Sequence, residues 1–285
     1  MAKMHITSRD NSLLRQVRAV RDGNIHDLIF VEGLRLCEEA YRSQLEIDAV
    51  VVSEELLRKE RAANAIAELS KVAKGVASVS EKLLESVSYT KTPQGIILLA
   101  RRPVASETRL AESLTVNPLL VVLHQINNPV NVGAILRTAE AAGAAGLITT
   151  RNTSDPHSPK SLRGAMGSAF RLPVWSGADY ADVIQWCRKR AIVTICADVG
   201  ASASYLDTDW TGPCALLLGP ESTGFTEEEL READRRVSIP MKGEAESLNV
   251  SVAAGILLFE AARQRAIALP QKSDTILRHG QYRER

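Results

Sequence analysis

Cysteine is scarce in this chain of 285 residues, and its four cysteines are widely scattered. None forms a C-x-x-C pair or has a ladder of histidines nearby, as structural zinc sites require. The four are Cys37, Cys187, Cys196 and Cys214. We therefore expect reduced, mostly buried thiols, with neither a metal site nor a disulfide framework.

Long apolar runs and a large excess of one charge are also absent. No run approaches the roughly 20 apolar residues that span a bilayer, and the first residues, MAKMHITSRDN, lack an apolar signal core. We therefore expect a cytoplasmic protein with no membrane partner. Because 35 basic and 34 acidic residues give a formal net charge of +1, any contact with nucleic acid must come from local patches.

The composition is that of a folded globular protein, with 45% hydrophobic and 24% charged residues. The length favours two domains over one. The first domain, residues 1–103, is predicted to be a small α/β unit. Its expected elements are helices from Asn11 to about Ala40, a strand in IDAVVVSEELL, a helix in RAANAIAELSKVAKG, a strand and small helix in VASVSEKLLESVS, and a strand in QGIILLARRP.

The stretch at 104–118 shows no periodicity and is predicted to be a linker. From Leu119 onward, apolar strands such as LLVVLHQI, GLITT and CALLLGPE alternate with helical patterns. This alternation indicates a parallel sheet with helices on both faces, in which ligands bind at the carboxyl ends of the strands. The last expected elements are a strand at Val237–Met241 and a helix from Ser247 to about Ala266. We place this domain at 119–269 and expect 270–285 to be a solvated tail rather than an arm that binds RNA.

Three loops of the second domain carry an unusual density of polar residues. In HQINNPVNVGAILRTAE we expect Asn131 to cap a helix, Gly133 to allow close approach of a neighbour, and Arg137 to share a face with Glu140. An arginine in this position can bind a phosphate or carboxylate through its planar fork. The alternative is a surface ion pair between Arg137 and Glu140.

The second loop, LLLGPESTGFTEEEL, places Glu221 at the carboxyl end of a buried strand, between two glycines. An ordinary turn into a helix capped by Thr226 and Glu229 is the alternative. The third loop places Ser247, Asn249 and Ser251 at the head of an apolar helix, where backbone donors and short polar side chains can form a compact site for a polar ligand. That helix contains Gly255, which close packing on another element would explain.

Taken together, the stretches NPVNVGAILRTAE, LLGPESTG and SIPMKGEAESLNVSVA resemble the three signature motifs of the SpoU/TrmH family of RNA ribose 2'-O-methyltransferases, in the same order and spacing. The resemblance extends from Leu119 to about Arg265. It implies that the mostly parallel sheet is tied in a deep trefoil knot that holds S-adenosylmethionine. It also implies a homodimer whose active sites are shared across the interface.

The resemblance also assigns roles to individual residues. Arg137 would be the central catalytic residue. Because a guanidinium is hard to deprotonate, we expect it to bind an RNA phosphate and to stabilise the developing alkoxide, and the final proton acceptor stays open. The residues expected to support it are Asn131, Glu140, Glu221, Ser247 and Asn249. The backbone neighbourhoods expected to hold the cofactor are those of Leu218, Gly219, Ile239, Met241 and Leu248.

The phrase FVEGLRLCEEA makes the first domain resemble the ribosomal-protein-like RNA-binding domain that is often fused to these enzymes. This arrangement favours ribosomal RNA as the substrate over transfer RNA. A basic group opposed only by Asp155 is the expected RNA contact, with an ordinary exposed helix as the alternative. Its members are Arg151, Lys160, Arg163 and Arg171. We expect His124 and His157 to be structural or solvent-facing.

Two other functions fit part of this pattern. A related knotted enzyme could methylate a base nitrogen, but it would need a carboxylate base near the methyl donor in place of Arg137. A protein with this fold could also bind RNA without chemistry. The presence of Asn131, Arg137 and Glu221 favours an enzyme over that alternative.

Overall fold

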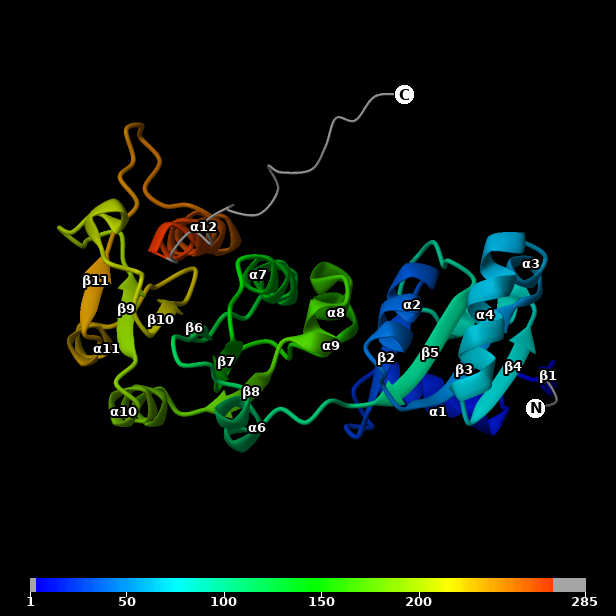
Figure 1. The fold of residues 1–285 in the computed structure, drawn as a ribbon. Coiled ribbons are helices and arrows are strands. Elements are labelled where there is room, and N and C mark those ends of the chain that lie inside the picture. The colour runs from blue at the N-terminus through cyan, green and yellow to red at the C-terminus, as the bar shows by residue number, and fades with distance from the viewer. Residues whose placement is uncertain (1–3, 269–285) are drawn as a thin grey trace, which may run out of the picture.

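The structure is a computed structural model that describes residues 4–268. Within this range the chain forms two separate sheets (Figure 1). The first has five strands in the order β1-β4-β3-β5-β2, and the second has six in the order β11-β9-β10-β6-β7-β8. The tail predicted at 270–285 lies outside the described residues.

The first sheet is mixed, because β3 and β2 each pair antiparallel with β5 while the other pairs are parallel. Its elements are β1 (Met4–Ile6), α1 (Ser12–Arg21), β2 (Leu28–Glu32), α2 (Leu34–Arg42), β3 (Ile47–Ser53), α3 (Glu54–Leu57), α4 (Glu60–Val72), β4 (Gly75–Val79), α5 (Glu81–Val87) and β5 (Ile96–Arg101). The small α/β unit is therefore confirmed.

Strand β2 corrects the prediction that the sequence is helical from Asn11 to Ala40. Its residues are all buried and pair with β5 along their whole length. The stretch LIFVE is rich in β-branched and aromatic residues, which fit a strand buried on both faces. The chain then turns into α2 at Gly33, whose φ of 101° is rarely accessible to other residues.

The second sheet is parallel at every strand pair. Its elements are α6 (Glu107–Glu112), β6 (Leu119–Leu123), α7 (Pro129–Ala141), β7 (Gly146–Thr150), α8 (Pro159–Ala165), α9 (Ser168–Arg171), β8 (Val174–Ala178), α10 (Tyr180–Lys189), β9 (Val193–Ala197), η1 (Tyr205–Asp207), β10 (Cys214–Leu218), α11 (Glu227–Glu232), β11 (Arg235–Val237) and α12 (Val250–Ala268).

Helices cover both faces of this sheet, as the sequence predicts. Along β6, Val121 faces the core formed with α7 and α12, while its neighbour Val122 faces the core formed with α10. This alternation places α7, α8 and α12 on one side and α6, α10 and α11 on the other (Figure 1). Continuous apolar strands are required because neither face meets water.

The second domain differs from the sequence prediction in the bounds of two elements and in one additional helix. Strand β11 ends at Val237 instead of Met241, and α12 begins at Val250 instead of Ser247, so residues 239–248 form neither helix nor strand. The stretch SPKSLRGAMGSAF forms two short helices, α8 and α9, which are separated by Met166 and Gly167, both with positive φ. The stretch predicted as a linker contains α6, whose Leu110 is fully buried.

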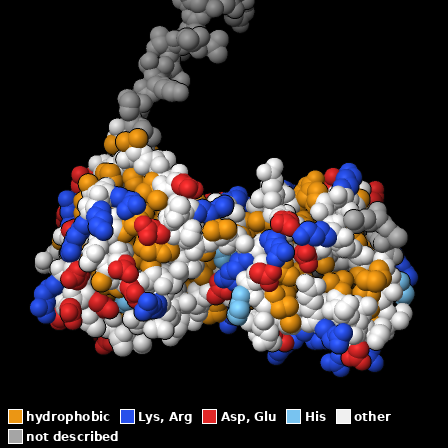
Figure 2. All heavy atoms as spheres, turned by 90° about the horizontal axis from the view of Figure 1, so that it is seen from below, with side chains coloured by type: hydrophobic (Ala, Val, Ile, Leu, Met, Phe, Trp, Pro, Cys, Tyr) orange, Lys and Arg blue, Asp and Glu red, His pale blue; other side chains and the backbone are white. Residues whose placement is uncertain are grey.

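The four cysteines are free and buried, as expected. Among residues 4–268, no cluster of histidine, cysteine and carboxylate side chains has the size to hold a metal ion. No helix in the same range combines the length and the apolar character needed to cross a membrane. Basic and acidic side chains are mixed on both lobes of the face in Figure 2. Any anion site on the described surface must therefore be a local arrangement of charges.

Candidate functional site

Three loops far apart in sequence meet at the start of helix α7. The amide nitrogen of Asn131 donates a hydrogen bond to the Glu221 carboxylate, and the amide nitrogen of Asn249 donates to Asn131 Oδ1 at 3.4 Å. Asn131 is buried, whereas Glu221 and Asn249 are exposed. The structure therefore brings together one polar residue from each of the three motifs at the carboxyl end of β10.

The start of α7 explains why Asn131 is available for this contact. The helix is capped by Asn128, whose Oδ1 accepts from the backbone N–H of Val130 at 3.0 Å, and Pro129 occupies the first helical position. Asn131 therefore lies in the first turn, and the prediction that it is the N-cap is wrong. An N-cap side chain bonds to its own helix, so Asn128 leaves Asn131 free to contact the other two loops.

The loop after β10 packs against two stacked rings, those of Phe225 and His124. A Cβ on Gly219 would lie 2.6 Å from the ring of Phe225, which itself stacks on His124 at 5.5 Å. The Nε2 atom of His124 lies 2.9 Å from Glu229, and Thr226 and Glu229 form the predicted capping box. His124 is buried against Phe225 and Glu229, so its ring is a structural support, as expected, and the burial lowers its pKa.

His157 is also structural. It is buried, and its Nε2 lies 3.3 Å from the carbonyl oxygen of Ala169. Burial lowers its pKa to about 4, with a further contribution from Arg102. The neutral ring therefore acts as a packing residue of the core at neutral pH.

Residues 239–248 offer backbone groups that the described part of the chain does not use. Neither their backbone nor their side chains form a hydrogen bond to other described residues. Ile239 and Met241 are half-buried, and Leu248 is exposed. Free N–H and C=O groups beside apolar side chains are what a purine ring needs from a binding loop. Together with Leu218 and Gly219 at the end of β10, this segment fits an adenosine-containing cofactor.

In the third motif, Ser247 and Asn249 differ in their contacts. Ser247 is exposed and has no hydrogen-bond partner within residues 4–268. Asn249 caps α12, because its Oδ1 accepts from Ser251 N at 2.9 Å and Ser251 Oγ at 2.6 Å, while its amide nitrogen reaches Asn131. Asn249 therefore caps its helix and also contacts the first motif, and its role in the reaction stays a prediction.

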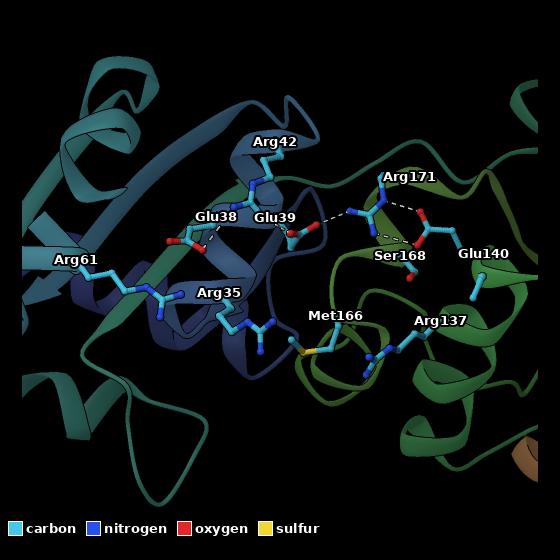
Figure 3. Close-up of a pocket in the computed structure, with 11 residues that line it drawn as sticks. Arg35, Glu38, Glu39, Arg42, Arg61, Arg137, Glu140, Met166, Ser168 and Arg171 are labelled. Carbon is cyan, nitrogen blue, oxygen red and sulfur yellow. Dashed lines mark hydrogen bonds and ion pairs between the residues drawn. The ribbon is translucent and has the colours of Figure 1, made fainter. Parts of the chain in front are cut away.

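Arg137 lies apart from this cluster within the chain. It comes six residues after Asn131, which corresponds to about 9 Å along a helix axis. Its exposed side chain lines a cleft of about 550 Å³ between the two sheets, together with Arg35 of α2 and Arg61 of α4 (Figure 3). The alternative surface pair is wrong, because Glu140 binds Arg171 instead of Arg137.

Arg171 joins the two halves of the molecule across this cleft. Its guanidinium contacts Glu140 of α7 at 2.5 and 2.9 Å and Glu39 of α2 at 2.6 Å. Its hydrogen bond holds the pKa of Glu140 below the usual value. The pKa of Glu39 is also lowered: burial acts to raise it, and Arg171 and Arg42 outweigh that effect. Arg171 is therefore committed to two carboxylates and is no longer a free cation for RNA.

Ion pairs also determine which other members of the predicted basic group are available to RNA. Arg151 forms an ion pair with Asp179 at 2.8 Å, and Asp155, expected to oppose the group, pairs with Arg102. Lys160 and Arg163 are exposed, without an ion pair to any described residue. These two remain the RNA contacts that the sequence predicted on α8.

The sequence did not identify Arg35 and Arg61 as site residues. Each lies on an ordinary exposed helix position in a different part of the first domain. Only the packing of α8 against β2, which brings that domain against the second sheet, places them opposite Arg137. No local sequence signal marks these two residues.

Comparison with known proteins places the whole chain among RNA-modifying enzymes. Residues 118–259 match the SpoU rRNA Methylase family, and residues 14–98 match an MRM3-like substrate binding domain. A 23S rRNA (uridine(2479)-2'-O)-methyltransferase of Streptomyces viridochromogenes is 33% identical over 195 residues, which are 67% of this chain and 67% of the relative. The 23S rRNA (guanosine-2'-O-)-methyltransferase RlmB of Haemophilus influenzae is 34% identical over 204 residues, 70% of this chain and 82% of the relative.

A solved structure extends the similarity over both sheets. The crystal structure of an AdoMet-bound rRNA methyltransferase from Sinorhizobium meliloti matches with a TM-score of 0.79 and 29% sequence identity. The match covers 91% of this chain and 97% of that chain. The arrangement of two domains is therefore shared with that protein.

Proposed function

This chain belongs to the SpoU rRNA methylase family, and we propose that it transfers the methyl group of S-adenosylmethionine to a ribose 2'-hydroxyl of ribosomal RNA. The observation that carries this proposal is the contact of Asn131, Glu221 and Asn249 beside the free backbone of residues 239–248. It is a site where a cofactor and a polar substrate group can be held together.

The relatives favour this function over its rivals. The relatives that match two thirds or more of this chain are named as 23S rRNA enzymes, which supports ribosomal over transfer RNA. Their names specify 2'-O transfer, which argues against methylation of a base nitrogen and against a module that only binds RNA. One relative is named for a uridine and the other for a guanosine. The names therefore do not identify the base of the target nucleotide, which has to be found by mapping the methylated position.

The experiment that tests the function is methyl transfer from labelled S-adenosylmethionine to 23S rRNA from a strain lacking the gene, followed by digestion to nucleosides. Label in a 2'-O-methylated nucleoside is the expected result. Label in a methylated base would replace the proposal by base methylation. Calorimetry with S-adenosylmethionine in the absence of RNA tests the alternative of a module that only binds RNA, since such a module would not bind the cofactor.

The cofactor supplies an electrophilic methyl group, and the residues assigned to it are Leu218, Gly219, Ile239, Met241 and Leu248. The protein's task is to orient the ribose hydroxyl and to stabilise the charge that develops on it. We assign Arg137 to the neighbouring phosphate and to that oxygen. A guanidinium has a reference pKa above ~12, so it donates hydrogen bonds and does not act as the base.

Asn249 provides a test that separates site geometry from helix capping. Serine at position 249 is as good an N-cap as asparagine, but it is too short to reach Asn131. We therefore expect Asn249→Ser to keep the thermal stability of the protein and to lower kcat about tenfold or more, because the Asn131–Glu221 pair loses its support. Asn249→Ala should lose about 1 kcal/mol of stability as well. Normal kcat in Asn249→Ser would assign this residue to capping alone.

A homodimer is the second part of the proposal. The outer face of α12 exposes Val252 and Phe259, which lie two turns apart on the same side of the helix, and Val130 is exposed on the adjoining α7. Exposed apolar surface of this kind favours a protein partner. A second copy would also supply Arg137 to the cofactor loop of its neighbour, and the separation of Arg137 from Asn131 along α7 of one chain favours this arrangement.

Light scattering checks the dimer directly. Wild-type protein is expected at twice the mass of one chain, and Phe259→Asp at the mass of one chain with methyl transfer lost, because burying a charge in the interface is costly. Val199→Asp is the matched control, since Val199 is equally apolar and exposed but lies in the loop after β9, away from α12. A monomeric wild-type protein with full activity would contradict the shared site.

Three further features belong to the same proposal. The family resemblance supports a trefoil knot in which residues 239–249 pass through a loop of the second domain. The two sheets support a first domain at 1–103 and a second domain that includes 119–268, and α6 joins the predicted linker 104–118 to the second domain, because Leu110 packs in a core of that sheet. The end of the domain at 269 and the 270–285 tail stay predictions. A ribosomal RNA substrate supports a cytoplasmic location.

A further inference from the structure

We propose that the cleft between the two sheets binds the RNA backbone on one side of the target nucleotide, and that Arg35 and Arg61 position it by binding phosphates. This inference rests on the proposed function and adds two residues to it. Arg35 lies on α2 and Arg61 on α4, across the cleft from Arg137 of α7 (Figure 3).

The cleft carries more positive than negative charge. Five arginines and three glutamates line it, a formal excess of two positive charges. The whole chain has a formal net charge of only +1. A local excess of this kind attracts a polyanion even when the overall charge is near zero.

The ion pairs in the cleft leave three of these arginines free. Glu38 and Glu39 pair with Arg42, at 3.9 and 2.6 Å, and Glu39 and Glu140 pair with Arg171. Every carboxylate of the cleft is therefore matched. Within residues 4–268, no ion pair or side-chain hydrogen bond involves the other three guanidinium groups, those of Arg35, Arg61 and Arg137.

Free guanidinium groups in a shared cleft are suited to phosphate. Each presents a rigid fork of N–H donors that matches phosphate oxygens in bidentate fashion. Like charges that face one cleft repel one another, and a bound anion relieves this repulsion. The volume of about 550 Å³ is large enough for a segment of RNA backbone to enter.

The Arg171 bridge fixes the distance between the two sides of this cleft. Arg171 holds Glu39 on the helix that carries Arg35, and Glu140 on the helix that carries Arg137. A phosphate bound by Arg35 or Arg61 is thus placed at a set distance from Arg137. The first domain then contributes to the affinity for the RNA beside the methylated nucleotide.

The test measures RNA binding and methyl transfer in the full-length protein with Arg35→Ala, Arg61→Ala and the double variant. Arg58→Ala is the matched control, because Arg58 is an exposed arginine close to Arg61 that does not line the cleft. The RNA is 23S rRNA from a strain lacking the gene, and binding is followed as a function of salt concentration. Cofactor binding by calorimetry shows that each variant keeps its folded second domain.

Each arginine that binds a phosphate adds about 0.7 to 0.9 to the slope of log affinity against log salt. The double variant is therefore expected to lose roughly 1.4 to 1.8 of that slope. Its KM for RNA should rise about tenfold or more, with kcat changed about twofold at most, since the contact serves binding before the chemical step. Arg58→Ala should match wild type in both.

The inference is overturned if the double variant keeps the slope and KM of Arg58→Ala, or if it loses kcat while KM is unchanged. The binding measurement needs no turnover. A wild-type protein that failed to methylate ribose would therefore defeat the proposed function and leave the cleft to be judged by its salt dependence.

Discussion

Arg137→Ala and Arg137→Lys are each expected to lower kcat for methyl transfer by about 10²- to 10³-fold, the usual loss when one preorganised donor to a developing oxyanion is removed. The neutral hydroxyl is a poor nucleophile, so the oxygen gains negative charge as the methyl group moves. A guanidinium can contact that oxygen and the adjacent phosphate at once. Lysine keeps the charge but offers no planar fork, so it is expected to rescue little.

Single-turnover rates with saturating RNA measure this step separately from binding. Arg109→Ala is the control, because Arg109 is an exposed arginine on α6 of the second domain and does not line the cleft. Cofactor affinity should be unchanged in all three variants. Near-normal turnover in Arg137→Lys would exclude the bidentate role, and an unchanged rate in Arg137→Ala would remove Arg137 from the catalytic residues.

The sequence was sufficient to predict the sheet of the second domain, and the physical reason is its burial. Strands β6 and β10 have helices on both faces, so they read as unbroken apolar runs. Strand β2 is also an apolar run, but it has only five residues and helical patterns on both sides, so the sequence pattern predicts a helix there. Its pairing with β5, about 70 residues away, decides its conformation, and such pairing leaves no local signal.

The candidate site was predictable to a similar extent. Asn131, Glu221 and Asn249 were each visible as polar residues at the carboxyl edge of the sheet, and the structure brings them into contact. The cleft was not visible, because Arg35 and Arg61 become neighbours of Arg137 only when two domains pack. Arg171 was predicted to contact RNA, but it forms ion pairs with Glu39 and Glu140, two carboxylates that are distant in sequence.

Two helical glycines are expected to respond to alanine with opposite signs. Alanine is favoured over glycine in a helix by about 1 kcal/mol at both positions. At Gly133 of α7, however, a Cβ would lie 3.0 Å from Gly164 Cα and closer still to the carbonyl oxygen of Ser161, both backbone atoms of α8. At Gly255 of α12 the nearest atom is a side-chain methyl of Thr138 at 3.9 Å, an ordinary contact.

Backbone atoms cannot rotate away, so Gly133→Ala must push α8 from α7, and overpacking of this kind costs about 1–3 kcal/mol in the free energy of unfolding. Gly255→Ala should instead gain up to about 1 kcal/mol, because the close packing expected at Gly255 from the sequence is absent within the described chain. Urea midpoints of the two variants give the comparison. Gly133→Ala should also lower methyl transfer, since Arg137 lies one turn further along α7 and moves with it. Stabilisation by both substitutions would mean that α7 and α8 can separate freely, and the cleft beside them would then have no fixed width.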